Sequence, residues 1–207
     1  GKILPKKQGI YLLDKENIIS VVNDIKPDWI FHLAVYGTYP QQVDLYAMVQ
    51  TNIVGTINLV NACLKSGFEI FVNTGTSSEY GFKDHRPGEN EILDPNSYYA
   101  FTKASATMFC HYTAISQNVY IQTLRLYSVY GPFEEPTRLI PVLILNAFKG
   151  KLPHRLVSPA VAHDLMYIED AEDAYIKTAT LSKQEPGAIY NVGTGVQMSI
   201  RDVIEIV

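Results

Sequence analysis

Two residues one helical turn apart, Tyr99 and Lys103, carry side chains that together could move a proton. Positions i and i+4 lie on the same face of a helix, so the phenol and the ammonium can point at one spot. A free phenol has a pKa of about 10 and is a poor base at neutral pH, but a nearby cation favours the phenolate and lowers that pKa. The pair could therefore give and take the proton of a sugar or steroid hydroxyl. Because Tyr-x-x-x-Lys also arises by chance, the pair needs support from its surroundings.

A cluster of hydroxyl side chains, Thr74 to Ser78, follows a short apolar stretch at residues 69–73 that has the pattern of a buried strand. In open α/β sheets, ligands bind beyond the carboxyl ends of the strands. The cluster therefore lies where chemistry is expected. The alternative at this point is a Ser/Thr-rich turn without a catalytic role.

Strand and helix patterns alternate around these residues. We expect helices at 15–25, 42–65, 98–116, 139–149 and 169–181, strands at 29–34, 69–73, 119–126 and 188–192, a loop at 79–96, a loop or short strands at 151–162, and a last helix that begins at Ile200. The order predicts an α/β fold with a doubly wound parallel sheet and a smaller mixed lobe towards the C-terminus. His32, inside an apolar strand, is expected to be a satisfied core residue rather than a ligand.

The composition is that of a globular protein, with 47% hydrophobic and 18% charged residues among 207. A net charge of -4 and the lack of a basic run argue against nucleic-acid binding. Cys63 and Cys110 fall in expected helices without metal-ligand spacing, so both are expected to be small buried hydrophobes. Because the sequence has neither an apolar run of 18 residues nor a signal-peptide pattern, we expect a cytoplasmic location and no membrane contact.

Six fragments occur in one order along the chain: His32–Ala34, Thr51–Thr56, Thr76–Gly81, Tyr99 with Lys103, Val129–Pro132 and Tyr190–Gly195. This series resembles the extended short-chain dehydrogenase/reductase family, the NAD(P)-dependent sugar-nucleotide epimerases, dehydratases and reductases. The resemblance covers nearly the whole chain. It implies a Rossmann-like, partial dinucleotide-binding domain in residues 1–132. Residues 133–207 are expected to form a substrate-binding lobe interleaved with the last strands of the sheet.

The resemblance also implies roles for individual residues. Tyr99 is the expected acid/base, and Lys103 lowers its pKa while binding the nicotinamide ribose of NAD or NADP. Thr76 orients the reacting oxygen of a nucleotide-diphosphate sugar. Further cofactor-side positions are Leu33, Ala34, Asn52, Thr74 and Leu126, and further substrate-side positions are Ser77, Ser78, Ser128, Arg138 and His163. No metal site is expected.

Two further expectations come from the same resemblance. The planar guanidinium of Arg138 would suit a diphosphate, because its donors match two phosphate oxygens at once. The helices at 42–65 and 98–116 are expected to make a homodimer contact.

Departures from the family pattern reduce the number of reactions that the resemblance implies. Members that dehydrate sugars carry an acidic pair directly after the catalytic Thr, and Ser77 and Ser78 stand there instead. A 4-epimerase or 4-keto reductase is therefore expected, with a 4,6-dehydratase as the alternative. The motif Thr-Ser-Ser-Glu-Tyr-Gly at residues 76–81, together with Ser128, resembles the sequence of the 4-keto reductases that make deoxyhexoses such as CDP-abequose. His163 stands where relatives often have Arg.

The glycine-rich strand-turn-helix that holds the cofactor pyrophosphate in this family is not among the 207 residues and should precede residue 1. The first βαβ unit is thus expected to be missing, and the tail of the substrate lobe to be cut at Val207. The residue that selects NAD or NADP would lie in that segment. The alternative from another functional class is a catalytically incompetent relative that serves as a binding or assembly module.

Overall fold

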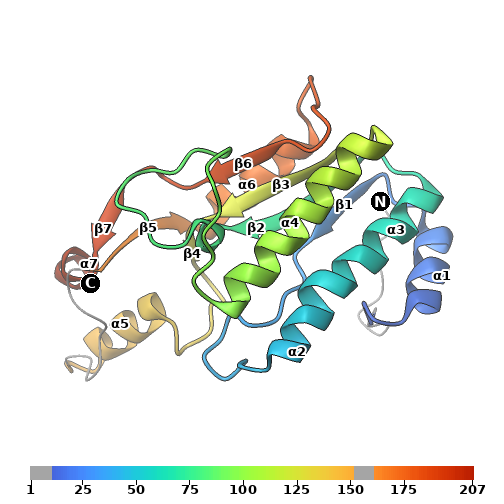
Figure 1. Cartoon of the computed structure of the whole chain (residues 1–207). Helices are drawn as coiled ribbons and strands as arrows, with labels where there is room; N and C mark the ends of the chain where they lie inside the picture. Colours follow the sequence, from blue (N-terminus) through green and yellow to red (C-terminus); the bar gives the residue numbers. More distant parts are fainter. Residues whose placement is uncertain (1–10, 152–160) are drawn as a thin grey trace. The chain divides into compact units, whose positions relative to one another are not determined.

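The computed structural model describes residues 11–151 and 161–207. Within them the predicted alternation of strands and helices forms an α/β, Rossmann-like fold (Figure 1). The chain divides into two compact units, the first with Gly1–Arg125 and Tyr175–Asn191, the second with Leu126–Ala174 and Val192–Val207. Most of the segment at 151–162, predicted as a loop or short strands, lies outside the described residues.

The main sheet of the described residues has the strand order β1–β2–β3–β6. These strands are β1 (Trp29–His32), β2 (Ile70–Thr76), β3 (Ile121–Leu126) and β6 (Ile189–Val192). Strands β1 and β2 run parallel, with Trp29 opposite Ile70 and His32 opposite Asn73. Their carboxyl ends therefore meet at one edge of the sheet. Strand β2 is longer than predicted, so Thr74 and Thr76 belong to the strand and not to a turn after it.

Three helices, α1 (Lys15–Ile25), α3 (Thr56–Ser66) and α4 (Tyr98–Gln117), lie side by side in the first unit (Figure 1). Helix α4 packs on β2. The core between these elements is apolar and holds Ile18, Val22, Val60, Ala62, Cys63, Phe71, Cys110, Ala114 and Ile121. Both cysteines are free and buried, as predicted, and burial raises the pKa of each thiol to about 12.

The helix ends follow from local sequence. The side chain of Ser97 caps α4 by accepting a hydrogen bond of 3.2 Å from the backbone N–H of Ala100. At the other end Asn118 adopts a left-handed conformation with φ of 52° and ends the helix. Asp14 caps α1 in the same way, accepting from the N–H of Asn17 at 3.0 Å. The cap at Ser97 fixes where α4, with its candidate catalytic residues, begins.

The helix predicted at 42–65 is interrupted by a π-helical stretch. It consists of α2 (Leu45–Met48), the π-helical segment η1 (Val49–Gly55) and α3. Gly67, with φ of 81°, ends it. π-Helical turns are rare and occur often at functional sites. Segment η1 contains Asn52, one of the residues singled out from the sequence.

The second unit contains a small mixed sheet that the sequence did not predict. Its strands are β4 (Ser128–Tyr130), β5 (Ala162–Tyr167) and β7 (Gln197–Ser199), in the order β4–β5–β7, with β4 parallel and β7 antiparallel to β5. The remaining helices are α5 (Leu139–Phe148), α6 (Ile168–Ala179), which continues into the first unit, and α7 (Ile200–Ile206). Helix α7 begins at Ile200, as predicted, and Ser199 caps it. Among the described helices, none is both long and apolar enough to cross a membrane.

Candidate active site

Thr76 ends β2 and begins a short 3-10 helix, η2 (Ser77–Tyr80), in a reciprocal cap. Its hydroxyl oxygen accepts a hydrogen bond of 3.3 Å from the N–H of Ser78. In return the Glu79 carboxylate accepts one of 3.0 Å from the N–H of Thr76. Neither contact uses the hydroxyl proton of Thr76. This proton can therefore be donated to an oxygen at the carboxyl edge of the sheet.

Helix α4 carries Tyr99 and Lys103 one turn apart, with Tyr99 half-buried and Lys103 only 3% exposed. The side-chain ammonium of Lys103 makes no hydrogen bond or ion pair with any other residue that the structure describes. Burial lowers the pKa of Lys103, and the negative charge of Glu79 acts in the opposite direction. A buried ammonium with unused donors is costly, so its presence indicates a ligand with oxygen acceptors.

Asn52, in the π-helical segment η1, holds two neighbouring elements together. Its side-chain oxygen accepts from the N–H of Tyr36 at 2.9 Å, and its amide nitrogen donates to the Tyr36 carbonyl at 2.8 Å. The second amide N–H reaches the hydroxyl of Thr102 on α4 at 2.9 Å. Both amide N–H groups are thus used within the protein. Asn52 positions the chain after β1 against α4.

His32, at the end of β1, is a hydrogen-bonded core residue, as predicted. The Thr56 hydroxyl donates to the Asn52 carbonyl at 2.7 Å, so it accepts the hydrogen bond of 2.8 Å from Nε2–H of His32. Burial lowers the pKa of His32 to about 4, and the charge of Lys103 acts in the same direction. The imidazole is therefore neutral across the physiological pH range.

This neutral histidine makes stability depend on pH. Below its ordinary pKa of 6.5 the unfolded chain binds a proton that the folded chain does not accept until about pH 4. We expect the free energy of unfolding to fall by about 3 kcal/mol between pH 6.5 and 4 from this group, and to lose nothing more from it at lower pH. Urea unfolding at several pH values measures the loss.

A matched pair of variants assigns that loss to His32. His32→Gln keeps a donor for Thr56 but does not titrate, so its stability should fall by clearly less over the same range. His85→Gln removes an exposed histidine whose pKa is raised by Asp84 and then Glu91, a group that stabilises the folded chain on acidification, so this variant should show a loss at least as large as that of wild type. Equal losses in wild type and His32→Gln would contradict the assignment.

The hydroxyl of Thr74, on β2, is hydrogen-bonded to the phenol of Tyr175 on α6. Tyr175 is buried and packs edge-on against Phe31 of β1, with ring centroids 6.0 Å apart. Burial raises the pKa of Tyr175 to about 12, and a phenolate at Tyr99 would act in the same direction. Tyr175 therefore stays protonated and fixes the side chain of Thr74.

The remaining cofactor-side positions of the first unit, Leu33 and Ala34, directly follow β1 and are exposed. The first unit thus brings Leu33, Ala34, Thr74 and Thr76 to the carboxyl ends of β1 and β2, which run parallel. Ser77 and Ser78 are half-buried in η2. Tyr99 and Lys103 belong to the same unit through α4, which packs on β2 and on η2.

The other predicted positions, Leu126, Ser128, Arg138 and His163, belong to the second unit. Ser128 lies on β4, opposite Leu165 of β5. Arg138 precedes α5 and donates to Glu134 at 3.4 Å. His163 on β5 is half-buried, and burial and then the charge of Arg138 lower its pKa. Two basic side chains in each other's field are a suitable arrangement for an anion. No group of His, Cys, Asp or Glu side chains in the described ranges is arranged to hold a metal ion.

The sequence of residues 7–193 matches the NAD dependent epimerase/dehydratase family. The chain belongs to this family. Similarity to one member, the "Uncharacterized UDP-glucose epimerase YtcB" of Bacillus subtilis, extends over 99% of the chain with 30% identity over 215 residues. The chain spans 66% of the length of that relative.

Solved structures of other proteins share the fold. The UDP-glucose 4-epimerase of Thermus thermophilus, in complex with NAD, superimposes with a TM-score of 0.84 at 25% identity, covering 98% of this chain and 68% of the other. RMD from Pseudomonas aeruginosa, complexed with NADPH, gives a TM-score of 0.85 at 28% identity, covering 98% of this chain and 71% of the other.

Three residues of this epimerase/dehydratase-family chain were missed from the sequence: Glu79, Arg125 and Tyr175. Glu79 begins a charged stretch whose composition predicts a loop, and Arg125 falls in the stretch 119–126, whose pattern predicts only a strand. Tyr175 belongs with Ala171 and Thr178 to the buried stripe of α6, and this helical spacing was the one signal that its side chain points inward.

Proposed function

We propose that the full-length protein is an NAD(P)-dependent enzyme that acts on carbon 4 of a nucleotide-activated hexose, by 4-keto reduction or 4-epimerisation. The observation that carries this proposal is the buried ammonium of Lys103, which has no partner among the described residues and lies one helical turn from Tyr99. The helix that carries both residues packs against the Thr76 strand. The relatives support the proposal, since those compared above are named as UDP-glucose epimerases or are complexed with NAD or NADPH.

The residues present fit the nicotinamide-ribose part of such a cofactor. Lys103 has N–H donors that no described residue uses, and ribose hydroxyls are suitable acceptors. Leu33 is 55% exposed and Ala34 is small and exposed, so the carboxyl edge of β1 offers an open apolar surface. When bound, the cofactor supplies or accepts the hydride at the sugar carbon. The side chains of the protein orient the sugar oxygen and transfer its proton.

In the proposed mechanism Thr76 donates its hydroxyl proton to the oxygen on the reacting carbon and so fixes its direction. Tyr99 transfers a proton to that oxygen when a ketone is reduced, and removes one when an alcohol is oxidised. Lys103 stabilises the phenolate that forms on Tyr99 through its positive charge. Asn52 and Tyr175 act indirectly, by fixing the chain after β1 and the side chain of Thr74.

The arrangement of η2 favours this chemistry over 4,6-dehydration. Loss of the hydroxyl from carbon 6 requires an acid and a base beside the catalytic Thr, and Ser77 and Ser78 offer neither. The one carboxylate of η2, Glu79, is fully buried and paired with Arg125 at 2.8 Å. It is therefore not available to a substrate.

For the substrate's diphosphate we propose Arg138 and His163 of the second unit. Arg138 keeps 44% of its side chain exposed while contacting Glu134, and its charge reaches His163. A dianionic diphosphate would favour protonated His163 and offset the repulsion between the two basic groups. Ser128, on the neighbouring strand β4, would contact the sugar.

The proposal is tested with the full-length protein and three nucleotide sugars. UDP-glucose and dTDP-glucose are incubated with NAD, and UDP-4-keto-6-deoxy-D-glucose with NADPH. We expect either NADPH oxidation with the keto sugar or an epimerised product from UDP-glucose, followed by absorbance and chromatography. If no nucleotide sugar is converted, the proposed function is wrong.

We also propose that the protein forms a homodimer through the exposed side of α4 and the adjoining α2. Large apolar side chains at helical spacing run along α4 and are between 50% and 72% exposed, namely Tyr98, Phe101, Met108, Tyr112 and Ile115. Near the start of α4, Leu45 and Val49 join Tyr98 and Phe101 around a cavity of about 710 Å³. A second copy would cover this stripe with its own α4.

Sedimentation or light scattering tests this contact. We expect the wild type to be a dimer at micromolar concentration and Met108→Glu, which puts a charge in the middle of the stripe, to be a monomer. Ile176→Glu is the matched control, because Ile176 is 51% exposed on another helix and should not affect assembly. A monomeric wild type or a dimeric Met108→Glu would refute this contact.

A further inference from the structure

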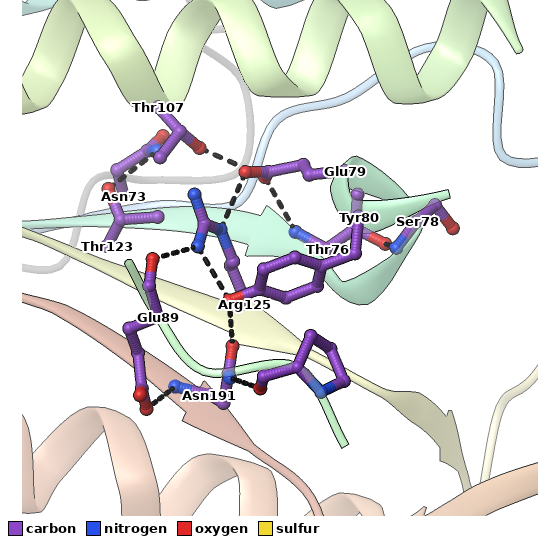
Figure 2. A network of polar contacts seen from close by, with 11 residues as sticks. Asn73, Thr76, Ser78, Glu79, Tyr80, Glu89, Thr107, Thr123, Arg125 and Asn191 are labelled. Carbon is purple, nitrogen blue, oxygen red and sulfur yellow. Dashed lines mark hydrogen bonds and ion pairs between the residues drawn. The ribbon is translucent and has the colours of Figure 1, made fainter. Parts of the chain in front are cut away.

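The carboxylate of Glu79 lies at the centre of a polar network that includes Thr76 (Figure 2). Glu79 is 0% exposed. Its Oε1 atom accepts from the backbone N–H of Thr76 and from the hydroxyl of Thr107 on α4, both at 3.0 Å. Its Oε2 atom accepts from Nε of Arg125 on β3 at 2.8 Å. One carboxylate thus joins the end of β2, the middle of α4 and the neighbouring strand.

Gly75 leaves the space in which this carboxylate lies. A Cβ atom at Gly75 would come within 2.8 Å of Oε1 of Glu79 and within 2.9 Å of the Thr123 methyl group. Any side chain at this position would push the carboxylate away from the strand. Because Glu79 is held this close to β2, a small displacement of its carboxylate moves the backbone of Thr76.

The other side of the network reaches the segment that leads into α4. Nη1 of Arg125 donates to the phenol oxygen of Tyr80 at 2.7 Å and to the Glu89 carbonyl at 2.9 Å (Figure 2). Tyr80 donates to the side-chain oxygen of Asn191 on β6 at 2.8 Å, and the Asn191 amide donates to the Pro87 carbonyl at 2.9 Å. The loop before Ser97 is therefore fastened to the same network as Thr76.

Three buried charges lie around α4: the carboxylate of Glu79, the guanidinium of Arg125 and the ammonium of Lys103. Arg125 is paired directly with Glu79, whereas Lys103 has no carboxylate within 4.0 Å among the described residues. The groups in whose field Lys103 lies are Glu79 from η2, Cys110 from its own helix and His32 from β1. Of these, Glu79 is the acid that opposes the burial cost of the ammonium most strongly.

We infer that Glu79 is a positioning residue of the acid-base site. It holds the Thr76 backbone in register with α4, the helix of Tyr99 and Lys103. The inference rests on the proposed function, because it concerns the same site. Glu79 itself touches neither substrate nor cofactor, since Thr76, Thr107 and Arg125 surround its carboxylate.

Two variants separate this role from a merely structural one. Glu79→Gln leaves the Arg125 guanidinium buried without a counter-charge, so the urea midpoint of this variant should be lower than that of wild type. Glu79→Gln combined with Arg125→Met removes both charges and should recover much of that midpoint. We expect kcat to be lower by about 10- to 100-fold in both proteins, with KM within about threefold of wild type, because the reacting groups are misplaced while binding is kept.

Glu91→Gln replaces a carboxylate that pairs with Lys83 in the loop before α4 and should keep the wild-type kcat. Thr107→Val preserves the side-chain shape, loses only the hydrogen bond from α4, and should lower kcat by about three- to tenfold. If kcat recovers together with stability in the double variant, or if Thr107→Val is as active as wild type, the inference is wrong. A wild type that converts no nucleotide sugar refutes the proposed function instead.

Discussion

Replacing Tyr99 by Phe should lower turnover of the nucleotide sugar by about 10²- to 10⁴-fold, while the affinity for NAD or NADP stays within about threefold of wild type. The substitution keeps the ring, which is half-buried on α4, and removes only the hydroxyl. Proton transfer to the sugar oxygen then has no donor, but the proposed contacts of the cofactor with Lys103 and the edge of β1 are retained. Steady-state kinetics gives the first quantity and calorimetric titration the second.

A second tyrosine serves as the matched control for this experiment. Tyr120 is 42% exposed just before β3, outside the site and outside the stripe of α4, and Tyr120→Phe should turn over like wild type. An active Tyr99→Phe would show that another group moves the proton. Equal loss in both variants would show that the effect comes from folding and not from chemistry.

Replacing Lys103 by Met should make the protein more stable and nearly inactive. Burial lowers the pKa of Lys103 below its ordinary value of 10.5, so the folded chain bears the cost of a desolvated ammonium. Met fills similar space without a charge. We expect the free energy of unfolding to rise by about 1 kcal/mol or more at pH 7, and turnover to fall by at least about 100-fold.

The sign of the pH dependence distinguishes this cause from better packing. Above its folded-state pKa the wild type no longer carries the charge, and above pH 10.5 the unfolded chain also loses it. The gain in the free energy of unfolding of Lys103→Met over wild type should therefore be largest at neutral pH and decrease as the pH rises towards 10.5. Lys183→Met, at an exposed lysine, should change stability by less than about 0.5 kcal/mol. A less stable Lys103→Met would contradict the electrostatic account.

The features predicted correctly from sequence are those set by local periodicity. The i and i+4 spacing predicts that Tyr99 and Lys103 share one helix, and both lie on α4. The apolar run at 29–34 gave β1, two residues too long, and the hydroxyl cluster was placed near the end of β2. These signals lie within a few residues of the element they define.

The features missed from sequence depend on contacts between distant residues. The π-helical segment η1 looks like ordinary amphipathic helix in sequence, and Asn52 is tied to Tyr36 and Thr102, which lie 16 and 50 residues away. Strands β4 and β7 of the second unit have only three residues each, and with β5 they form a sheet through pairing rather than propensity. The pairing of Glu79 with Arg125 spans 46 residues. A charged residue beside a loop normally indicates solvent, so nothing local showed that Glu79 is buried.

The central claim is that Thr76, Tyr99 and Lys103 direct chemistry to carbon 4 of a nucleotide-activated hexose, and proton NMR of the sugar products tests it most directly. The full-length protein is incubated with UDP-glucose and dTDP-glucose in the presence of NAD, and with UDP-4-keto-6-deoxy-D-glucose in the presence of NADPH. The account predicts a change confined to carbon 4, either inversion of its hydroxyl or reduction of its ketone, which disappears in Tyr99→Phe. Loss of the hydroxyl from carbon 6, or no change in any of the three sugars, would contradict it.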